Sequence, residues 1–209
     1  MKKICSLIIV AFSLSLNIAN ASDNNINLAK KWTDNRGREL LKTFSIKEKE
    51  LKYKKLDEVF SNYVDVAFVG KFSLGKYYRQ LNADQKTIYL DLFKRYCLSS
   101  YKKLPLSFAK DIAFEIVSAK KENKSYVVKT NINLPKELQQ KEDEDNVVVS
   151  FYLRKSGNSF LIHDIKVMEV SLLLSFRNKF TKMMFNSDGE IDWFLEDFEV
   201  LIDRIEDSL

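Results

Sequence analysis

His163 and Asp164 are the residues whose types could do acid–base chemistry. His163 is the only histidine of the chain, and Asp164 follows it directly. A histidine oriented by a carboxylate can act as a general base. Neighbouring residues on a strand, however, point to opposite faces of a sheet. The pair is therefore badly placed for a catalytic dyad, and we expect His163 to be an ordinary strand residue.

Other reactive arrangements are missing from the sequence. Glu142 and Glu144 stand in a polar loop segment, where no burial is expected to make either one a general acid. One histidine and Cys97, the only cysteine beyond the leader, cannot supply the three or four such ligands of most metal sites. The chain has no glycine-rich phosphate loop and no Gly-x-Ser-x-Gly turn. We therefore expect no enzyme activity, no cofactor and no metal; a hydrolase would lack its constellation of residues.

The start of the chain has the pattern of a secretory signal peptide. The basic "MKK" precedes the apolar run "ICSLIIVAFSLSLNIA", and "ANA" ends the run with small residues. We expect cleavage before Ser22. A membrane anchor is the alternative, but the run of 16 residues is shorter than the roughly 20 residues that span a bilayer. The sequence predicts a cleaved leader over 1–21 and a single exported domain over 22–209.

Charge and composition limit the partners of that domain. Without Lys2 and Lys3 it has 32 basic and 29 acidic side chains, a net charge of +3. The basic residues alternate with acidic ones, so no nucleic-acid partner is expected. The charged run "KEKELKYKK" over 47–55 is expected to be a solvated helix face; a contact for acidic headgroups or for a partner is the alternative. A single Cys97 cannot form an internal disulfide, so we expect a small buried residue there.

Apolar residues recur at helical spacing at both ends of the domain. Asn82 and Gln85 form a candidate capping box, and Pro105 would help end the helix that follows them. A short helical connection with Gly70 and Gly75 precedes this helix. The predicted helices cover residues 25–44, 56–64, 84–104, 172–185 and 191–205.

The middle of the domain changes to a period of two, which is typical of strands. Polar turns separate the segments, and strands joined in this way form an antiparallel meander. The fold class is therefore α+β, with helices packed on one face of a curved antiparallel sheet of about four strands. A filled core and an apolar cavity between the layers both agree with this pattern. The predicted strands cover residues 112–119, 125–134, 147–154 and 160–167.

Two stretches resemble the MlaC family, also called the toluene-tolerance auxiliary component of ABC transporters. "VDVAFVGKFSLGKYYRQLNADQ" carries the family's Leu-Gly-basic-aromatic-aromatic-basic pattern, followed by the helix cap. "FLIHDIKVMEVSLLLSFRNKF" carries its aromatic, Asp, Glu, Ser, Arg and Phe positions. The resemblance spans residues 56–104 and 160–205. The chain departs from it at Phe160, where Trp is usual, at His163, where Tyr is usual, and at Val170, where a Gly would permit a turn that a β-branched residue resists.

The resemblance implies a periplasmic phospholipid carrier that shuttles glycerophospholipids between the outer and inner membranes. Its partners would be an outer-membrane lipoprotein complex and an inner-membrane ABC transporter with its substrate-binding ring, a system linked to outer-membrane lipid asymmetry and toluene tolerance. The acyl chains would lie in an apolar cavity, with the headgroup near its mouth. Bound phospholipid would then be cargo and not a cofactor, and the carrier would be a monomer.

We assign eight residues to a lipid-binding site on this basis. Arg177 could meet the lipid phosphate; an ion pair with Asp164 or Glu169 is the alternative for its side chain. The apolar members of the predicted site are Val167, Leu172 and Phe176 on one wall and Val149, Phe151, Phe72 and Tyr78 on the other. The alternative function is an exported protein-interaction module with a solid core and no lipid ligand.

Overall fold

The structure is a computed structural model that describes residues 24–103, 112–133 and 146–209. The predicted leader and the acidic loop with Glu142 and Glu144 lie outside these residues. The described part of the first helix covers residues 24–44. The other helices are α2 (Lys49–Tyr63), α3 (Val66–Leu74), η1 (Tyr77–Arg79), α4 (Ala83–Lys102), α5 (Leu172–Asn186) and α6 (Ile191–Glu206). The strands are β1 (Ala113–Glu122), β2 (Ser125–Asn133), β3 (Asn146–Ser156), β4 (Ser159–Val167) and β5 (Val170–Ser171).

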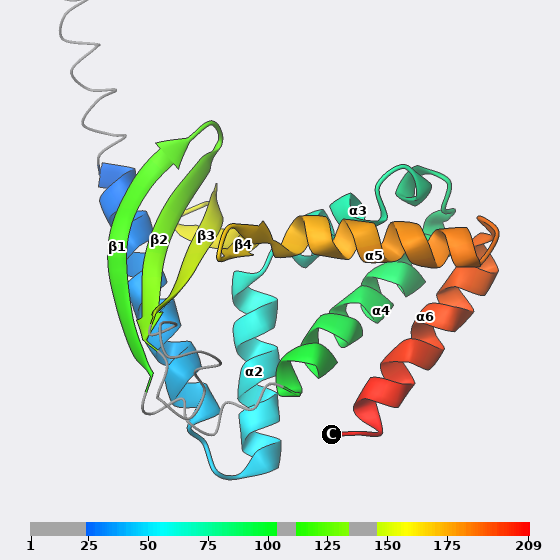
Figure 1. The fold of residues 1–209 in the computed structure, drawn as a ribbon, viewed down its shortest axis with the longest axis horizontal. Helices are drawn as coiled ribbons and strands as arrows, with labels where there is room; N and C mark the ends of the chain where they lie inside the picture. The colour runs from blue at the N-terminus through cyan, green and yellow to red at the C-terminus, as the bar shows by residue number, and fades with distance from the viewer. Residues whose placement is uncertain (1–23, 104–111, 134–145) are drawn as a thin grey trace, which may run out of the picture.

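The five strands form one antiparallel sheet in the order β1-β2-β3-β4-β5. This confirms the predicted meander and the α+β class. The strand β5, which has only two residues, was not predicted because it is too short to show a period. The sheet and the first helix form one end of the molecule, which we call the sheet lobe (Figure 1). We call α3 to α6 the helical lobe, and α2 stands between the two lobes (Figure 1).

The predicted helices are confirmed, and local chemistry explains their limits. Asn82 and Gln85 form the expected capping box at the start of α4, with Asn82 Oδ1 2.9 Å from the Gln85 amide nitrogen and Gln85 Oε1 3.0 Å from the Asn82 amide nitrogen. The first helix continues through Gly37, where an added Cβ would lie 2.7 Å from the Phe114 ring. The lack of a side chain at Gly37 therefore lets β1 pack closely on this helix. Pro105 lies outside the described residues.

The helical lobe has a buried aromatic core. Most of its rings meet edge to face or tilted, and the Phe180 and Phe198 centroids are 4.9 Å apart; Phe194 and Phe198 are stacked. Cys97 is buried in this core as expected, and burial raises the pKa of its thiol to about 12. The fully buried aromatic side chains of the lobe are Tyr89, Phe93, Phe180, Phe194 and Phe198.

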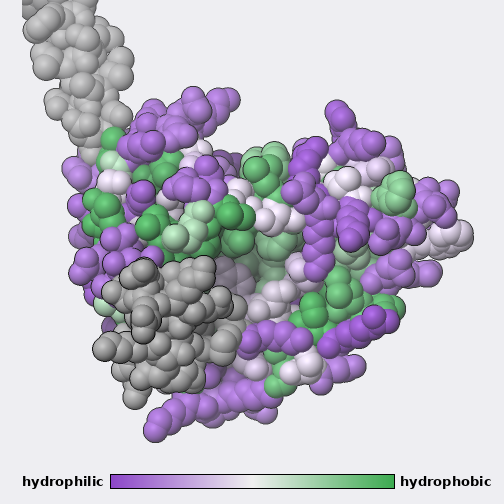
Figure 2. Space-filling view, viewed as in Figure 1, coloured by the Kyte–Doolittle hydropathy of each residue, from purple (hydrophilic) through white to green (hydrophobic). Residues whose placement is uncertain are grey.

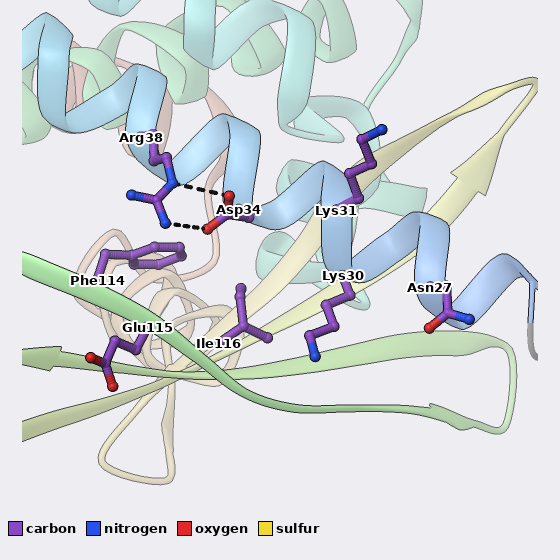
Figure 3. Close-up of a pocket in the computed structure, with 8 residues that line it drawn as sticks. All are labelled: Asn27, Lys30, Lys31, Asp34, Arg38, Phe114, Glu115 and Ile116. Atoms are coloured by element: carbon purple, nitrogen blue, oxygen red, sulfur yellow. Dashed lines mark hydrogen bonds and ion pairs between the residues drawn. The ribbon is translucent and has the colours of Figure 1, made fainter.

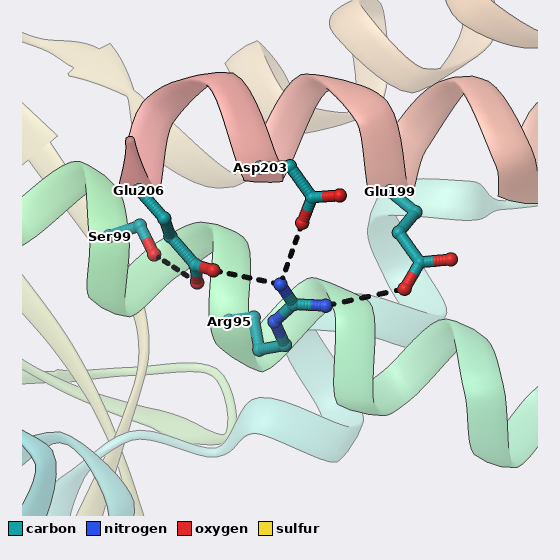
Figure 4. Close-up of polar contacts among 5 residues, drawn as sticks. All are labelled: Arg95, Ser99, Glu199, Asp203 and Glu206. Atoms are coloured by element: carbon teal, nitrogen blue, oxygen red, sulfur yellow. Dashed lines mark hydrogen bonds and ion pairs between the residues drawn. The ribbon is translucent and has the colours of Figure 1, made fainter. Parts of the chain in front are cut away.

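A charged cluster fastens α6 to α4 at the surface of the same lobe (Figure 4). The guanidinium of Arg95 contacts Glu199 at 3.5 Å, Asp203 at 2.9 Å and Glu206 at 2.8 Å. Ser99 Oγ donates a hydrogen bond to Glu206 at 2.9 Å. The hydrogen bond from Arg95 lowers the pKa of the Glu206 carboxyl. Exposed pairs of this kind add little each, so the buried aromatic core, and not this cluster, is the main source of stability here.

The sheet lobe is held by packing of the first helix on one face of the sheet. Trp32 of this helix lies between Tyr63 of α2, at 5.6 Å between centroids, and Phe160 of β4, at 6.1 Å. The Trp32 indole also donates a hydrogen bond to Ser159 Oγ at 3.1 Å. The buried residues of this core are Ala29, Tyr126, Val128, Leu153 and Phe160. Among the described helices, none has both the length and the hydrophobicity to cross a bilayer.

Candidate functional site

A row of apolar side chains crosses the face of the sheet that the first helix covers. Val149 of β3 pairs with Thr130 of β2 and with Val167 of β4, so the three side chains lie side by side. Phe151 lies two residues further along β3 on the same face and pairs with Ile165. Val149 is only 5% exposed. The row runs toward the start of α5, because β4 leads through β5 directly into that helix.

A β-bulge in β4 gives Val167 its place in this row. Tyr152 pairs with Asp164 and Leu153 pairs with Ile162, so His163 is the extra residue on β4. Simple alternation from Ile162 would have placed Asp164 on the covered face. The bulge instead brings Ile165 and Val167 to that face, opposite Phe151 and Val149. Sequence reasoning missed Ile165 for this reason, since the period of two is broken at His163.

The eight predicted lipid-binding residues fall into separate groups. Phe72, Tyr78 and Phe176 belong to the packing of the helical lobe, where Phe176 meets the Phe93 ring at 5.7 Å. Phe151 packs against the core of the sheet lobe. The remaining apolar residues are buried or half-buried, yet among the described residues they belong to none of the packed clusters. They are Val149, Val167 and Leu172.

Arg177 of α5 has partners that the sequence did not suggest. Its Nη1 donates a hydrogen bond to the Phe72 carbonyl at 3.2 Å, and its guanidinium carbon lies 5.1 Å from the centre of the Phe72 ring. An added Cβ at Gly75 would be 2.9 Å from the same guanidinium. Within the described residues, Arg177 forms no ion pair with Asp164 or Glu169. Its charge instead lies at the C-terminal end of α3, where the helix dipole favours a cation.

Both carboxylate oxygens of Asp164 accept hydrogen bonds at the junction where α5 begins. Its Oδ1 accepts hydrogen bonds from the Leu173 amide at 3.0 Å and the Ile165 amide at 2.8 Å, and its Oδ2 accepts one from Ser171 Oγ at 2.7 Å. Ser171 Oγ in turn accepts the Leu174 amide at 3.1 Å. These bonds satisfy the free amides of the first helical turn. Asp164 is therefore a capping residue of the strand-to-helix junction.

His163 contacts one hydroxyl, and its Nδ1 has no hydrogen-bond partner among the described residues that would orient the ring as a base. Its Nε2 is 2.9 Å from Ser125 Oγ, and its ring meets the Phe68 ring edge to face at 5.5 Å. Burial lowers the pKa of its imidazole, and the charge of Asp164 opposes that shift. Asp164 and His163 share no hydrogen bond, since both carboxylate oxygens face the start of α5. No group of three His, Cys, Asp or Glu side chains in the described ranges could hold a metal ion.

Two depressions mark the surface. The face in view in Figure 2 is hollowed between the sheet lobe and the helical lobe, and hydrophobic surface borders the hollow on both sides. A separate groove of about 560 Å³ lies between the first helix and β1 (Figure 3). Five charged side chains line that groove, and only Phe114 and Ile116 are apolar, so it does not suit an acyl chain. None of the eight predicted residues lines it.

Comparisons with known proteins place the chain in a family. The profile of the MlaC family, described as MlaC protein, matches residues 38–204. The chain belongs to the MlaC family. A phospholipid-binding protein from Ralstonia solanacearum, solved in complex with a phospholipid, shares the fold: the TM-score is 0.69 at 14% identity, over 85% of this chain and 98% of that chain. No curated protein sequence matches the chain.

The departures from the usual MlaC pattern are absorbed by their surroundings. The turn that follows β4 is made by Met168 (φ 48°) and Glu169 (φ 66°), both in the left-handed region. Val170 is a strand residue of β5 and needs no such conformation. The expected conflict at Val170 is therefore absent, and the strain falls on the two residues before it. Phe160 fills its position by packing on Trp32 and Tyr126.

Proposed function

We propose that this MlaC-family protein is a periplasmic phospholipid carrier. It would receive glycerophospholipids from one membrane and deliver them to the other as the non-membrane component of an ABC-type lipid transport system. Family membership supports lipid binding and transport. The R. solanacearum protein of the same fold was solved with a phospholipid. The observation that carries the proposal is the apolar row at the sheet–α5 junction: Val149 is buried and Val167 is half-buried, yet among the described residues neither belongs to a packed cluster.

The chemistry of such a carrier is burial without reaction. Each methylene that leaves water contributes about 0.8 kcal/mol, so a protein that replaces the bilayer must enclose both tails in apolar surface. Val149, Val167 and Leu172, with Phe151 beside them, would form the surface that the acyl chains touch. A headgroup would stay near the mouth of the hollow between the lobes. No proton transfer or bond cleavage is needed, which agrees with a binding protein and not an enzyme.

The helical lobe would supply the second wall. Phe72, Tyr78 and Phe176 already pack on its core, so in the carrier they would shape the wall and offer only part of their surface to lipid. Arg177 holds α5 against the end of α3 through Phe72 and Gly75. It would therefore fix the position of that wall, while its N–H groups other than the one bound to the Phe72 carbonyl could still meet a phosphate.

Export and partners follow from the same proposal. The chain would cross the inner membrane by means of the leader over 1–21 and act as a monomer in the periplasm. It would meet an outer-membrane lipoprotein complex at one end of its route and the substrate-binding ring of an inner-membrane ABC transporter at the other. Phospholipid is the cargo, and no cofactor takes part.

Native mass spectrometry of residues 22–209, purified without detergent, tests the proposal. The expected result is a mass excess equal to one phospholipid, which disappears on denaturation and is recovered by organic extraction. A clean protein mass, together with no uptake of labelled phospholipid from vesicles, would overturn the carrier function.

A protein-interaction module with a solid core remains the second candidate. The dense aromatic packing of the helical lobe favours it, because the rings of Tyr89, Phe93, Phe180, Phe194 and Phe198 are fully buried there. The two functions differ at the sheet lobe. A carrier takes up lipid there, whereas a solid module binds none under any loading condition.

A further inference from the structure

A basic corner stands where α3 turns into α4. Residues 66–90 contain four basic side chains and a single acidic one, Asp84. The turn lies at the end of the helical lobe that points away from the sheet (Figure 1). Its members, which we call the basic corner, are Lys71, Lys76, Arg79 and Lys86, with Tyr77 and Tyr78 of η1 between them.

The cations of the corner are grouped around two tyrosine rings. The Lys71 and Lys86 ammonium nitrogens are each 5.9 Å from the centre of the Tyr78 ring. The Lys76 nitrogen is 4.9 Å from the centre of the Tyr77 ring. The faces of aromatic rings attract cations. The two tyrosine rings therefore hold several positive charges close together, although basic and acidic residues alternate along much of the chain.

No acidic side chain neutralises this charge within the described residues. None of the four cations takes part in an ion pair there. Arg95, on the same helix as Lys86, shows the contrast, because three carboxylates of α6 surround it. Lys71, Lys76 and Arg79 are exposed. The corner thus presents free positive charge to the solvent.

The opposite charge is concentrated on α6. Residues 188–207 contain nine acidic side chains and one basic one. The two regions meet near the start of α4, where Gln85 Nε2 donates a hydrogen bond to Asp192 Oδ1 at 2.7 Å. A surface that attracts the corner would repel the outward side of α6. The charge pattern therefore fixes an orientation as well as an attraction.

We propose that the basic corner docks the protein on the surface of an anionic phospholipid bilayer. Lysine and arginine are attracted to anionic headgroups, and tyrosine rings favour the headgroup level of a membrane. A bilayer accepts a protruding turn without a matching pocket, and the charge and the two tyrosine rings of the corner together fit a headgroup layer. The inference goes beyond the carrier function and does not depend on it, since docking requires no lipid inside the protein.

Vesicle flotation of residues 22–209 at low salt tests the docking. The vesicles contain phosphatidylglycerol and phosphatidylcholine, or phosphatidylcholine alone. Each basic side chain near an anionic surface strengthens binding about five-fold. The double variant Lys76→Gln with Arg79→Gln should therefore bind the anionic vesicles about 25-fold more weakly. The matched control, Lys121→Gln with Lys124→Gln, removes the same charge from exposed positions at the β1–β2 turn of the sheet lobe and should leave binding within about two-fold.

The outcomes distinguish docking by the basic corner from a response to net charge and from the carrier function. Binding to anionic vesicles alone, lost with the corner variant and kept by the control, supports the proposal. Equal losses in both variants would mean a response to net charge, and no binding of the unmodified protein would exclude the bilayer as the partner of the corner; either result overturns the proposal. Lipid retained by the vesicle-free protein is measured in the same fractions and reports on the carrier function independently.

Discussion

The two lobes bury their apolar residues in different ways. In the helical lobe the buried aromatic rings touch one another. Phe180, for example, meets the rings of several neighbours on α4 and α6. In the sheet lobe one helix covers a twisted sheet, and part of the covered face belongs to no packed cluster among the described residues. Val149 and Val167 lie on that part.

This difference divides the buried apolar residues into two groups. One group stabilises the fold by packing, and the other belongs to no packed cluster among the described residues and is the group proposed to contact a ligand. A side chain that fills a core contributes to stability through contacts that a ligand cannot share. A side chain that is sheltered without being packed costs little to expose to a ligand. In the proposed carrier the helical lobe would form one wall, and the sheet–α5 junction would be the place for cargo. The predictions below test this division.

The largest expected effect concerns lipid content. Val149→Trp adds volume to the apolar row and should leave the purified protein without bound phospholipid, measured by native mass spectrometry. If the row faces a cavity, the free energy of unfolding should change by less than about 1 kcal/mol, whereas overpacking of a filled core would cost about 1–3 kcal/mol. Val117→Trp, at a position of β1 that is 51% exposed, is the control and should keep its lipid. A lipid-loaded Val149→Trp protein would show that this wall is assigned wrongly.

The next effect concerns stability in the other lobe. Phe180→Ala removes a fully buried ring from the helical core and should lower the free energy of unfolding by about 3–5 kcal/mol, measured by urea denaturation. Phe185→Ala changes the same residue type on α5 where the ring is 78% exposed and should cost less than about 0.5 kcal/mol. The folded fraction of Phe180→Ala should still carry lipid; selective loss of lipid with stability intact would reverse the roles of the two lobes.

A pair of glycines isolates the contribution of Arg177. Gly75 has a φ of 62° and the Arg177 guanidinium against it, whereas Gly157 has a φ of 57° and no atom within 4 Å of an added Cβ. Gly157→Ala should therefore cost about 1 kcal/mol from backbone strain alone. Gly75→Ala should cost about 1 kcal/mol more, because the guanidinium must move as well. Equal unfolding midpoints for the two variants would mean that the Arg177 guanidinium moves aside without cost and does not fix α5 against the end of α3.

The turn between β4 and β5 offers a stabilising change. Glu169→Gly relieves the backbone strain of a residue in the left-handed region. It should raise the free energy of unfolding by about 0.5–1 kcal/mol, after the entropic cost of a flexible glycine is subtracted. Glu169→Gln removes the charge without changing the backbone preference and should be neutral. A loss of stability in the glycine variant would contradict the assigned turn.

The smallest effect is a pH dependence at His163. Burial lowers the pKa of its imidazole in the folded protein, so the unfolded chain binds the proton more readily. Stability from this residue is therefore complete above the ordinary histidine pKa of about 6.5 and falls as the pH drops below it. His163→Gln, which can keep a hydrogen bond to Ser125, should flatten this part of the curve of unfolding free energy against pH. An unchanged curve would place the imidazole in water.

Local patterns account for most of the fold that could be predicted. The spacing of Tyr89, Phe93 and Tyr96 determines which face of α4 is buried, and the Asn82–Gln85 pair marks its start. The bulge at His163 could not be predicted, because it depends on how β3 pairs with β4. The partners of Arg177 were also hidden, since Phe72 lies 105 residues away in the sequence. The site was therefore predicted as one group of residues, and only the structure separates those that pack on the helical lobe from those that belong to no packed cluster among the described residues.

Photo-crosslinking with a phospholipid that carries a diazirine at the end of one acyl chain tests this division most directly. The protein is loaded from vesicles, separated from them, irradiated and mapped by tandem mass spectrometry. We predict labels on 147–151 and 165–172, and none on the buried faces of α4 and α6. Labels confined to α4 and α6, or no labels after verified loading, would contradict the assignment of the cargo to the sheet–α5 junction.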